Sequence, residues 1–212
     1  MCREDMLRFV NKRLGRLIGS SCRVEGLDVS YTDVRTFLEG GRVFLIEEKL
    51  LFISNMREAW EFMLNNLEYS NCLALLRELN KICGQGLYRG NGEIRSTPVS
   101  MGGTSWKPEI PVMADLYESI EKLEKFVCPV EKALGYFCFI TRAQMFIDGN
   151  KRVAQLMANK VLIENDIGVF RIPTENEDKF NIFKELLIGY YETGDYCKLM
   201  RFMRENCICY KD

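Results

Sequence analysis

Residues Ala143–Asn159 read AQMFIDGNKRVAQLMAN, and this stretch decides how the rest of the chain is interpreted. Gly149 permits a tight turn, and the apolar residues after it recur at helical spacing. A helix that begins at such a turn presents free backbone amides, which bind phosphate groups. Asp148 offers an oxygen ligand for Mg²⁺, and Arg152 offers a planar guanidinium for phosphate. On residue chemistry alone, a solvated turn that caps a helix explains the stretch equally well.

The composition is that of a globular protein. With 212 residues, of which 47% are hydrophobic and 28% charged, the chain is long enough to bury a core. The net charge of −1 gives no electrostatic reason to expect nucleic-acid binding. The chain contains no histidine, which removes the commonest general base from every candidate mechanism.

The cysteines and the chain start indicate a reducing compartment. There are nine cysteines and no CxxC pair, so a zinc site would need four thiolates from distant segments. We therefore expect reduced core thiols. The first residues carry charges at Arg3, Glu4, Asp5 and Arg8, so they lack the apolar core of a signal peptide. Since no apolar run approaches about 18 residues, we expect a cytoplasmic protein without membrane contact.

Apolar periodicity predicts a mainly α single domain over residues 1–212. The expected helices cover 2–18, 31–40, 43–66, 71–83, 112–127, 130–142, 150–165, 176–192 and 195–206. The stretch 43–66 suits one or two helices, with a break near Ser54 and Asn55. A short extended piece is expected at 169–172, closed by Pro173.

Residues 84–111 form the longest loop-rich segment. They hold six glycines and three prolines. The turn Met101-Gly102-Gly103-Thr104 predicts a short hairpin between 96–101 and 104–106. A long irregular segment inside a compact domain usually serves function, so we expect this one to do so.

The stretch 143–159 resembles the signature of the Fic/Doc family. That signature reads His-Pro-Phe-x-(Asp/Glu)-Gly-Asn-(Gly/Lys)-Arg, with an Asn seven residues after the Arg. The positions that match it are Phe146, Asp148, Gly149, Asn150, Lys151, Arg152 and Asn159. Gln144 stands where the family has its catalytic histidine, and Met145 stands where it often has proline. The resemblance implies a Fic-type helical bundle with a short β-hairpin flap.

Two further regions resemble Fic proteins. Residues 92–108 are similar to the flap and its lead-in. The family's flap aligns a target protein by strand addition, which implies target docking at Val99, Ser100, Met101, Gly102 and Gly103. Within the N-terminal helices, residues 1–70, Thr36 to Gly40 resembles the inhibitory motif (Ser/Thr)-x-x-x-Glu-(Gly/Asn). Arg35 takes the hydroxyl position of that motif, with Thr36 one step along, and Glu39 becomes the expected regulatory carboxylate.

The resemblance also implies an activity, the transfer of AMP from ATP to a protein hydroxyl. The phosphates would lie against Gly149, Asn150, Lys151 and Arg152, and Asp148 would hold Mg²⁺. Phe146 and Asn159 would support this loop within the motif segment 143–160. An amide such as Gln144 cannot accept a proton near neutrality, so we expect the activity to be impaired or lost.

Alternatives to this interpretation are a non-catalytic nucleotide- or protein-binding module, and transfer of another phosphate-containing group. Each residue also has a purely structural explanation: a solvated helix charge for Arg152, a helix cap for Asp148, a buried polar contact for Asn159, a plain helix end for Glu39, and core or rim packing for Tyr88 and Trp106. Gln155 stands where many regulated family members carry a second arginine, which implies a weaker inhibitory contact. The sequence sets neither the nucleotide base nor the oligomeric state.

Overall fold

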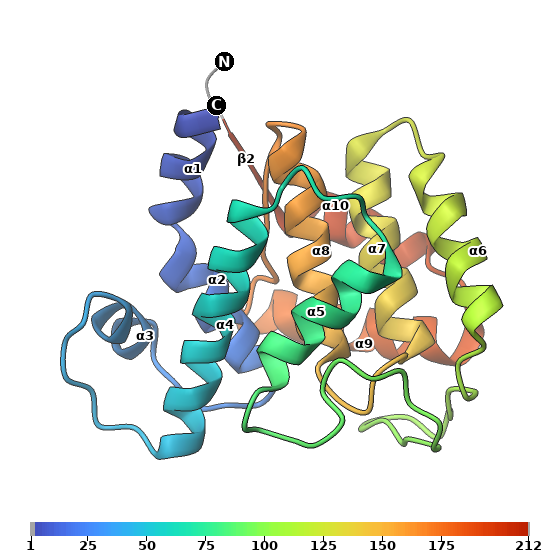
Figure 1. Ribbon diagram of the computed structural model, residues 1–212, viewed down its shortest axis with the longest axis horizontal. Helices are drawn as coiled ribbons and strands as arrows, with labels where there is room; N and C mark the ends of the chain where they lie inside the picture. The colour runs from blue at the N-terminus through green and yellow to red at the C-terminus, as the bar shows by residue number, and fades with distance from the viewer. Residues whose placement is uncertain (1–2, 212) are drawn as a thin grey trace.

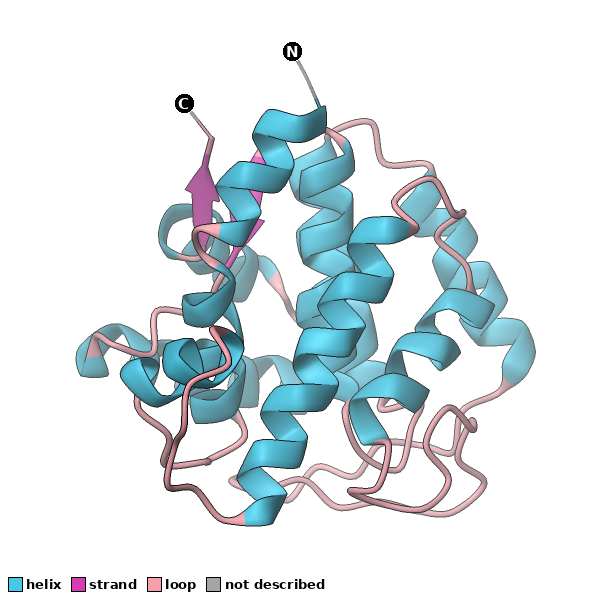
Figure 2. Ribbon diagram, turned by 60° about the vertical axis from the view of Figure 1, so that its left-hand side comes forward, coloured by secondary structure: helices cyan, strands magenta, loops and turns pink. Residues whose placement is uncertain are grey.

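The structure, a computed structural model, describes residues 3–211 (Figures 1 and 2). Its elements are α1 (Arg3–Asn11), α2 (Leu14–Val24), α3 (Tyr31–Leu38), α4 (Glu47–Asn65), α5 (Leu73–Gly84), α6 (Met113–Glu124), α7 (Pro129–Ala143), α8 (Asn150–Glu164), β1 (Gly168–Phe170), α9 (Glu177–Thr193), α10 (Cys197–Asn206) and β2 (Ile208–Tyr210). The expected mainly α architecture is confirmed. Apolar residues from α1 through α10 contribute to one buried cluster.

Helix α8, which the motif begins, runs through the centre of the bundle (Figure 1). Every residue from Arg152 to Ile163 is buried, because the helix is surrounded on all sides. Helix α7 packs along it, and α4, α5 and β1 cover its other faces. The loop that joins α7 to α8 therefore has a rigid helix on each side.

Two predicted helices differ from those observed. The stretch 2–18 forms two helices, α1 and α2, separated by a turn at residues 12–13, and α2 continues to Val24. The stretch 43–66 forms the single helix α4 without a break. Asn55, at the expected break, donates its side-chain amide to the Gln85 carbonyl at 2.7 Å. Its polar group is thus satisfied outside the helix and does not compete with the helix backbone.

The β pairing lies elsewhere than expected. Within residues 3–211 the strands are β1 and β2, which pair antiparallel with Gly168 opposite Tyr210. This pair includes part of the extended piece expected at 169–172. Helix α1 lies at the same end of the molecule as β2 (Figures 1 and 2).

The hairpin expected within 96–106 is not formed as paired strands, and this prediction is wrong at the level of secondary structure. The buried Arg95 guanidinium instead donates to the Thr97 carbonyl at 2.8 Å and to the Glu109 carbonyl at 2.5 Å. The Thr104 hydroxyl accepts from the Trp106 amide at 3.1 Å. Side chains thus form hydrogen bonds with backbone groups of this segment, which in a hairpin would bond to the opposite strand.

The expectation of core thiols holds for only some of the described cysteines, since Cys72, Cys128 and Cys197 are exposed. Cys22, Cys83, Cys138 and Cys207 are buried free thiols. Cys2 lies outside the described residues. No helix within residues 3–211 is both long and apolar enough to cross a membrane.

Candidate functional site

The loop of residues 144–149 is held from within by Asn150. The Asn150 amide oxygen accepts from the Phe146 backbone amide at 3.0 Å. Its amide nitrogen donates to the Phe146 carbonyl at 2.8 Å and to the Gln144 side-chain oxygen at 3.0 Å. Phe146 is fully buried beneath the loop. The Asn150 side chain is therefore committed to the loop itself.

Gly149 begins helix α8 in a conformation that favours glycine, with φ of +80°. A Cβ atom here would lie 2.5 Å from the Tyr88 hydroxyl and 2.8 Å from the Asn80 amide nitrogen. Both of those groups donate to the Asp148 carbonyl, at 3.2 Å and 2.8 Å. The loop thus approaches α5 and the Tyr88 segment so closely that only glycine fits.

Arg152 lies one turn into α8, and its side chain is only 4% exposed. It donates to the Cys83 carbonyl at 3.0 Å and to the Asp148 carboxylate at 2.8 Å. Its guanidinium carbon also lies 5.4 Å from the centre of the Tyr88 ring, within cation–π range. The buried position excludes an ordinary solvated helix charge.

Glu25, at the C-terminal end of α2, faces the same residues. One carboxylate oxygen lies 3.1 Å from the Lys151 ammonium, and the other lies 3.7 Å from the Arg152 Nε. That second oxygen and the Arg152 Nε are both buried without a hydrogen bond among residues 3–211. The Lys151 ammonium donates to the Val24 carbonyl at 3.2 Å as well. Helix α2 is thereby tied to the start of α8.

The charges around Arg152 shift its pKa. Burial acts to lower the pKa of this guanidinium, but the nearby carboxylates of Glu25 and Asp148 raise it by more, so the net shift is upward. The guanidinium therefore stays charged, as phosphate binding requires.

These residues line a cavity of about 160 Å³ at the N-terminus of α8. Glu25, Tyr88, Asp148 and Arg152 face it. The first backbone hydrogen bond of α8 runs from Val153 to the Gly149 carbonyl, so the amides of residues 150–152 have no acceptor within the helix. Such a helix start, with an arginine and a lysine in its first turn, attracts anions.

The structure brings together part of the predicted site. Asp148 and Arg152 line the cavity, and Lys151 reaches the Glu25 carboxylate at its edge. The Asn150 side chain does not line it, because it is hydrogen-bonded inside the loop. Its expected contact to phosphate is therefore limited to its backbone amide.

Gln144, at the position of the family histidine, is buried beside the motif loop. Its residue is 8% exposed, and its side-chain nitrogen donates to the Thr141 carbonyl at 2.6 Å. Its side-chain oxygen accepts from Asn150. The Gln144 carbonyl accepts from the Arg95 guanidinium at 2.5 Å, which ties the segment after residue 95 to the motif loop.

Glu39, the expected regulatory carboxylate, does not line the cavity. The prediction is corrected, because the carboxylate that faces Lys151 and Arg152 there belongs to Glu25. Glu39 lies on the surface at the end of α3, 2.8 Å from the Arg35 guanidinium. The sequence held the information to find Glu25: Ser21-Cys22-Arg23-Val24-Glu25-Gly26 fits the pattern (Ser/Thr)-x-x-x-Glu-(Gly/Asn) in every position. The segment around Glu39 fits it with the hydroxyl one step out of place.

Ser21 and Gln155 join α2 to α8. The Ser21 hydroxyl lies 3.1 Å from the Gln155 side-chain oxygen, and both residues are buried. Gln155 also donates to the Lys151 carbonyl at 3.2 Å. Gln155 thus bonds Ser21 and the α8 backbone. The charged partners of Glu25 are Lys151 and Arg152.

Asn159 anchors β1 to α8. Its side chain donates to the Phe170 carbonyl at 2.9 Å and accepts from the Phe170 amide at 2.8 Å. Asn159 and Phe170 are eleven residues apart in the sequence, and neither of them lines the cavity. The contact therefore supports the packing of β1 against α8. Trp106 stacks on Tyr191 with ring centres 5.7 Å apart, so it packs against α9.

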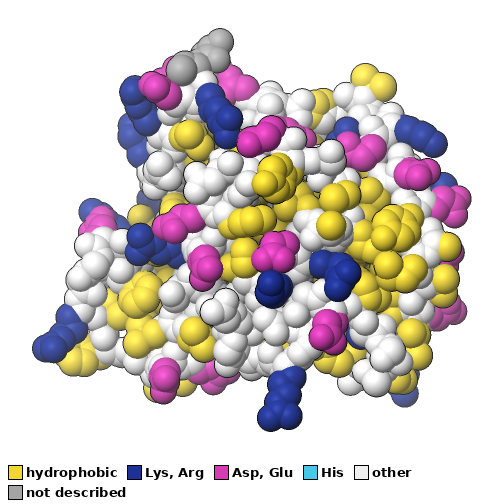
Figure 3. All heavy atoms as spheres, viewed as in Figure 1, with side chains coloured by type: hydrophobic (Ala, Val, Ile, Leu, Met, Phe, Trp, Pro, Cys, Tyr) yellow, Lys and Arg dark blue, Asp and Glu magenta, His cyan; other side chains and the backbone are white. Residues whose placement is uncertain are grey.

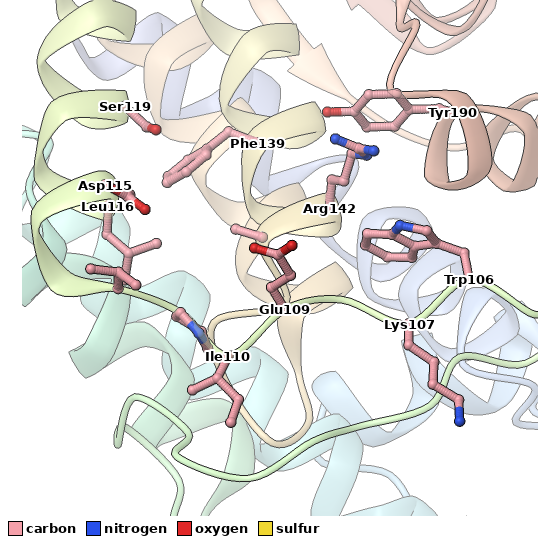
Figure 4. Close-up of a pocket in the computed structure, with 13 residues that line it drawn as sticks. Trp106, Lys107, Glu109, Ile110, Asp115, Leu116, Ser119, Phe139, Arg142 and Tyr190 are labelled. Atoms are coloured by element: carbon pink, nitrogen blue, oxygen red, sulfur yellow. The ribbon is translucent and has the colours of Figure 1, made fainter.

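A larger cavity, of about 510 Å³, lies between α6, α7, α9 and the segment after Trp106, and Ala143 at the start of the motif segment lines it (Figure 4). Arg142 points toward Trp106 and Tyr190, with its guanidinium carbon 5.2 Å and 5.6 Å from their ring centres (Figure 4). Apolar side chains also gather on the surface around α6 and α7 (Figure 3). The exposed ones at α6 and its ends are Val112, Met113, Tyr117, Phe126 and Val127.

The residues present fit a magnesium ion carried by a polyphosphate. Mg²⁺ is usually held by one or two carboxylates together with substrate phosphates and water. Asp148 offers such a carboxylate, with a side chain that is 56% exposed at the cavity. Within residues 3–211 no group of three acidic, cysteine or histidine side chains is placed to hold a metal ion without a ligand.

Comparison with known families and structures gives a consistent result. Residues 70–162 match the Fic/DOC family. No curated protein sequence matches the chain. Among solved structures, Fic-1 (residues 134–508) from C. elegans superposes with a TM-score of 0.81 at 20% identity, over 97% of this chain and 63% of that one.

Two bacterial structures are similar as well. A Fic family protein from Desulfovibrio desulfuricans has a TM-score of 0.77 at 17% identity, over 92% of this chain and 62% of its own. A Fic-domain-containing signaling protein from Bacteroides thetaiotaomicron has a TM-score of 0.75 at 22% identity, over 97% and 85%. At such identities the superpositions show the fold alone. The chain spans less than two thirds of the first two structures.

Proposed function

We infer from the match of residues 70–162 to the Fic/DOC family, which transfers nucleotide or phosphate groups onto proteins, that this chain binds a nucleoside triphosphate at the N-terminus of α8. We propose ATP with Mg²⁺ as the ligand and protein AMP transfer as the ancestral reaction, now impaired or lost. The observation that carries the proposal is the buried Arg152. It is held at a glycine-initiated helix start beside an accessible Asp148.

Each residue of the cavity has a defined task in this proposal. The amides of residues 150–152 and the Arg152 guanidinium hold phosphate oxygens. Asp148 holds the magnesium ion, which neutralises phosphate charge when it is bound. Gly149 permits the close approach of the backbone.

Within residues 3–211 no base stands at the position of the family histidine to accept the proton of a target hydroxyl. Gln144 takes the position of the family histidine, and both ends of its amide are hydrogen-bonded, to Thr141 of α7 and to Asn150 of α8. An amide is not a base near neutral pH. Since general base catalysis contributes about 10²–10⁴ in rate, AMP transfer should be slower by about that factor.

Glu25 opposes nucleotide binding in this arrangement. Its carboxylate faces Lys151 and Arg152, the two cations of the first turn of α8. A phosphate group needs the same cations, so it has to displace the carboxylate. Glu25 thus takes the inhibitory role that the family resemblance first suggested for Glu39.

Calorimetry with ATP and Mg²⁺ tests the binding step. Arg152→Ala should weaken ATP binding roughly tenfold to a hundredfold, because a charge-assisted hydrogen bond contributes about 1.5–3 kcal/mol. Glu25→Gln should strengthen it roughly tenfold, since it removes the competing charge and keeps the side-chain shape. Glu39→Gln is the matched control and should change nothing. Absence of ATP binding by both the native chain and Glu25→Gln would refute nucleotide binding.

Labelled ATP tests the chemical step. Gln144→His, combined with Glu25→Gln, should gain AMP transfer to protein, while Glu25→Gln alone should stay slow. Equal activity of the two would mean that another group accepts the proton. Transfer of label from the γ-phosphate and not from the α-phosphate would favour a different phosphate-containing group.

A second function, binding of a protein segment at residues 99–103, has its own observation. Within residues 3–211 the backbone of Val99–Gly103 makes no backbone hydrogen bond, so its donors and acceptors are free for strand addition. A partner strand would then run along the segment that Arg95 anchors. Proline substitution at Ser100 should weaken binding of such a partner without changing ATP affinity, because it removes one backbone donor.

A further inference from the structure

A second cavity, lined by arginine side chains and by apolar surface, lies on the opposite side of α2 from Glu25's partners. It has a volume of about 500 Å³ and is bounded by α2, the start of α3, and the segment 171–175 that follows β1. None of its lining residues is shared with the motif cavity. Its volume falls in the range of about 300–1,000 Å³ that is usual for small-molecule sites.

Three arginines from two separate segments line this cavity. Arg16 and Arg23 stand seven residues apart on α2, which places them on one face of the helix. Arg171 comes from the segment after β1. Glu175, the acidic residue of the lining, is paired with Arg171 at 2.5 Å. Within residues 3–211 neither Arg16 nor Arg23 forms a salt bridge, so the cavity has an excess of positive charge.

The other walls supply hydroxyl groups and a flat aromatic ring. The buried Thr174 contributes a side chain to the lining. Tyr31 contributes a flat ring, with the Arg16 guanidinium carbon 5.5 Å from its centre. Guanidinium groups match the geometry of phosphate oxygens, and a cavity lined by one sign of charge concentrates ions of the opposite sign.

We propose that this cavity, the α2–α3 pocket, binds a small phosphate-bearing molecule through Arg16, Arg23 and Arg171. The phosphate group lies between the two arginines of α2 and the guanidinium of Arg171. The ring of Tyr31 contacts the organic part of the molecule. The site is separate from the motif cavity and does not depend on nucleotide binding there.

Calorimetry with inorganic pyrophosphate as the probe tests the proposal. The double variant Arg16→Gln/Arg23→Gln should weaken pyrophosphate binding at least tenfold, because it removes two charged donors. Both side chains are exposed, so the variant should fold. The double variant Lys198→Gln/Arg201→Gln on α10 changes the net charge equally and should bind like the native chain. An equal loss in both double variants would mean that the net charge of the protein alone attracts pyrophosphate, and it would overturn the proposal.

Two further measurements identify the site and the chemistry. Arg152→Ala should retain pyrophosphate binding, whereas loss in that variant alone would assign the ion to the motif cavity. If Arg152→Ala does not fold, crystals of the native chain with pyrophosphate give the position directly. Citrate should bind at least tenfold more weakly than pyrophosphate, and equal binding would overturn the assignment to phosphate. Absence of pyrophosphate binding by the native chain would overturn the site itself.

Discussion

The carboxylate of Glu25 lies at the C-terminal end of α2, where a negative side chain is unfavourable to the helix dipole. Lys151 and Arg152 compensate for it from the first turn of α8. The same two cations begin a helix that would otherwise attract an external anion. One partly buried carboxylate therefore decides at the residue scale whether this helix start is available to a ligand.

Gly149→Ala should destabilise the protein by roughly 2–4 kcal/mol. The residue has a positive φ, and an added Cβ would lie 2.5 Å from the Tyr88 hydroxyl. Urea unfolding measures the change. Gly189→Ala is the matched control, because nothing lies within 4 Å of its added Cβ in the interior of α9. That substitution should stabilise by about 0.5–1 kcal/mol, and a similar loss in both variants would contradict the close approach at Gly149.

At the scale of elements, Arg95 replaces the strand pairing that residues 96–106 lack. Its guanidinium reaches carbonyls of the motif loop, of Thr97 and of Glu109. The Arg95 amide also donates to the Met145 carbonyl at 3.0 Å. One buried side chain thus fixes both ends of an irregular segment against the motif loop.

Arg95→Ala should release this segment and destabilise the fold by roughly 2–4 kcal/mol, since hydrogen bonds from a charged group contribute about 1.5–3 kcal/mol each. Hydrogen–deuterium exchange of residues 96–109 should become faster, while exchange in α8 should change less. Arg89→Ala, at an exposed residue of the same loop-rich region, should leave both unchanged. Unchanged exchange in Arg95→Ala would mean that the segment is held by its other contacts.

At the scale of the whole molecule, a single core carries both cavities; α2 lines one of them, and Glu25, which follows α2, lines the other. The core also buries thiols. Burial raises the pKa of Cys22, Cys83 and Cys138 from 9.0 to about 12. Between these values the unfolded chain loses protons that the folded chain keeps.

The free energy of unfolding should therefore fall as the pH rises above 9. Each thiol contributes at most about 1.4 kcal/mol per pH unit. Urea unfolding at pH 8 and pH 10 measures the fall. Cys138→Ala should be less stable at pH 8 but should show a smaller fall, whereas Cys128→Ala, at an exposed residue, should show the native fall. The same fall in Cys138→Ala would exclude that thiol as a source.

The sequence by itself determined the features that depend on neighbouring residues. The glycine turn, the helix after it and the mainly α class follow from local periodicity and backbone conformation, and the structure has all three. The motif around Arg152 was identifiable for the same reason, because its residues are consecutive. The pattern that contains Glu25 was also present in the sequence, but a similar pattern at Glu39 competed with it.

The tertiary structure showed which of those two glutamates contacts the start of α8, because that contact depends on which helix end packs there. It likewise showed that the Asn150 side chain bonds to its own loop and that Arg95 takes the place of a hairpin. Hydrogen-bond partners far apart in the chain leave no periodic trace in the sequence. A buried polar group takes whichever partner the packing brings within about 3 Å, and packing is a property of the whole fold.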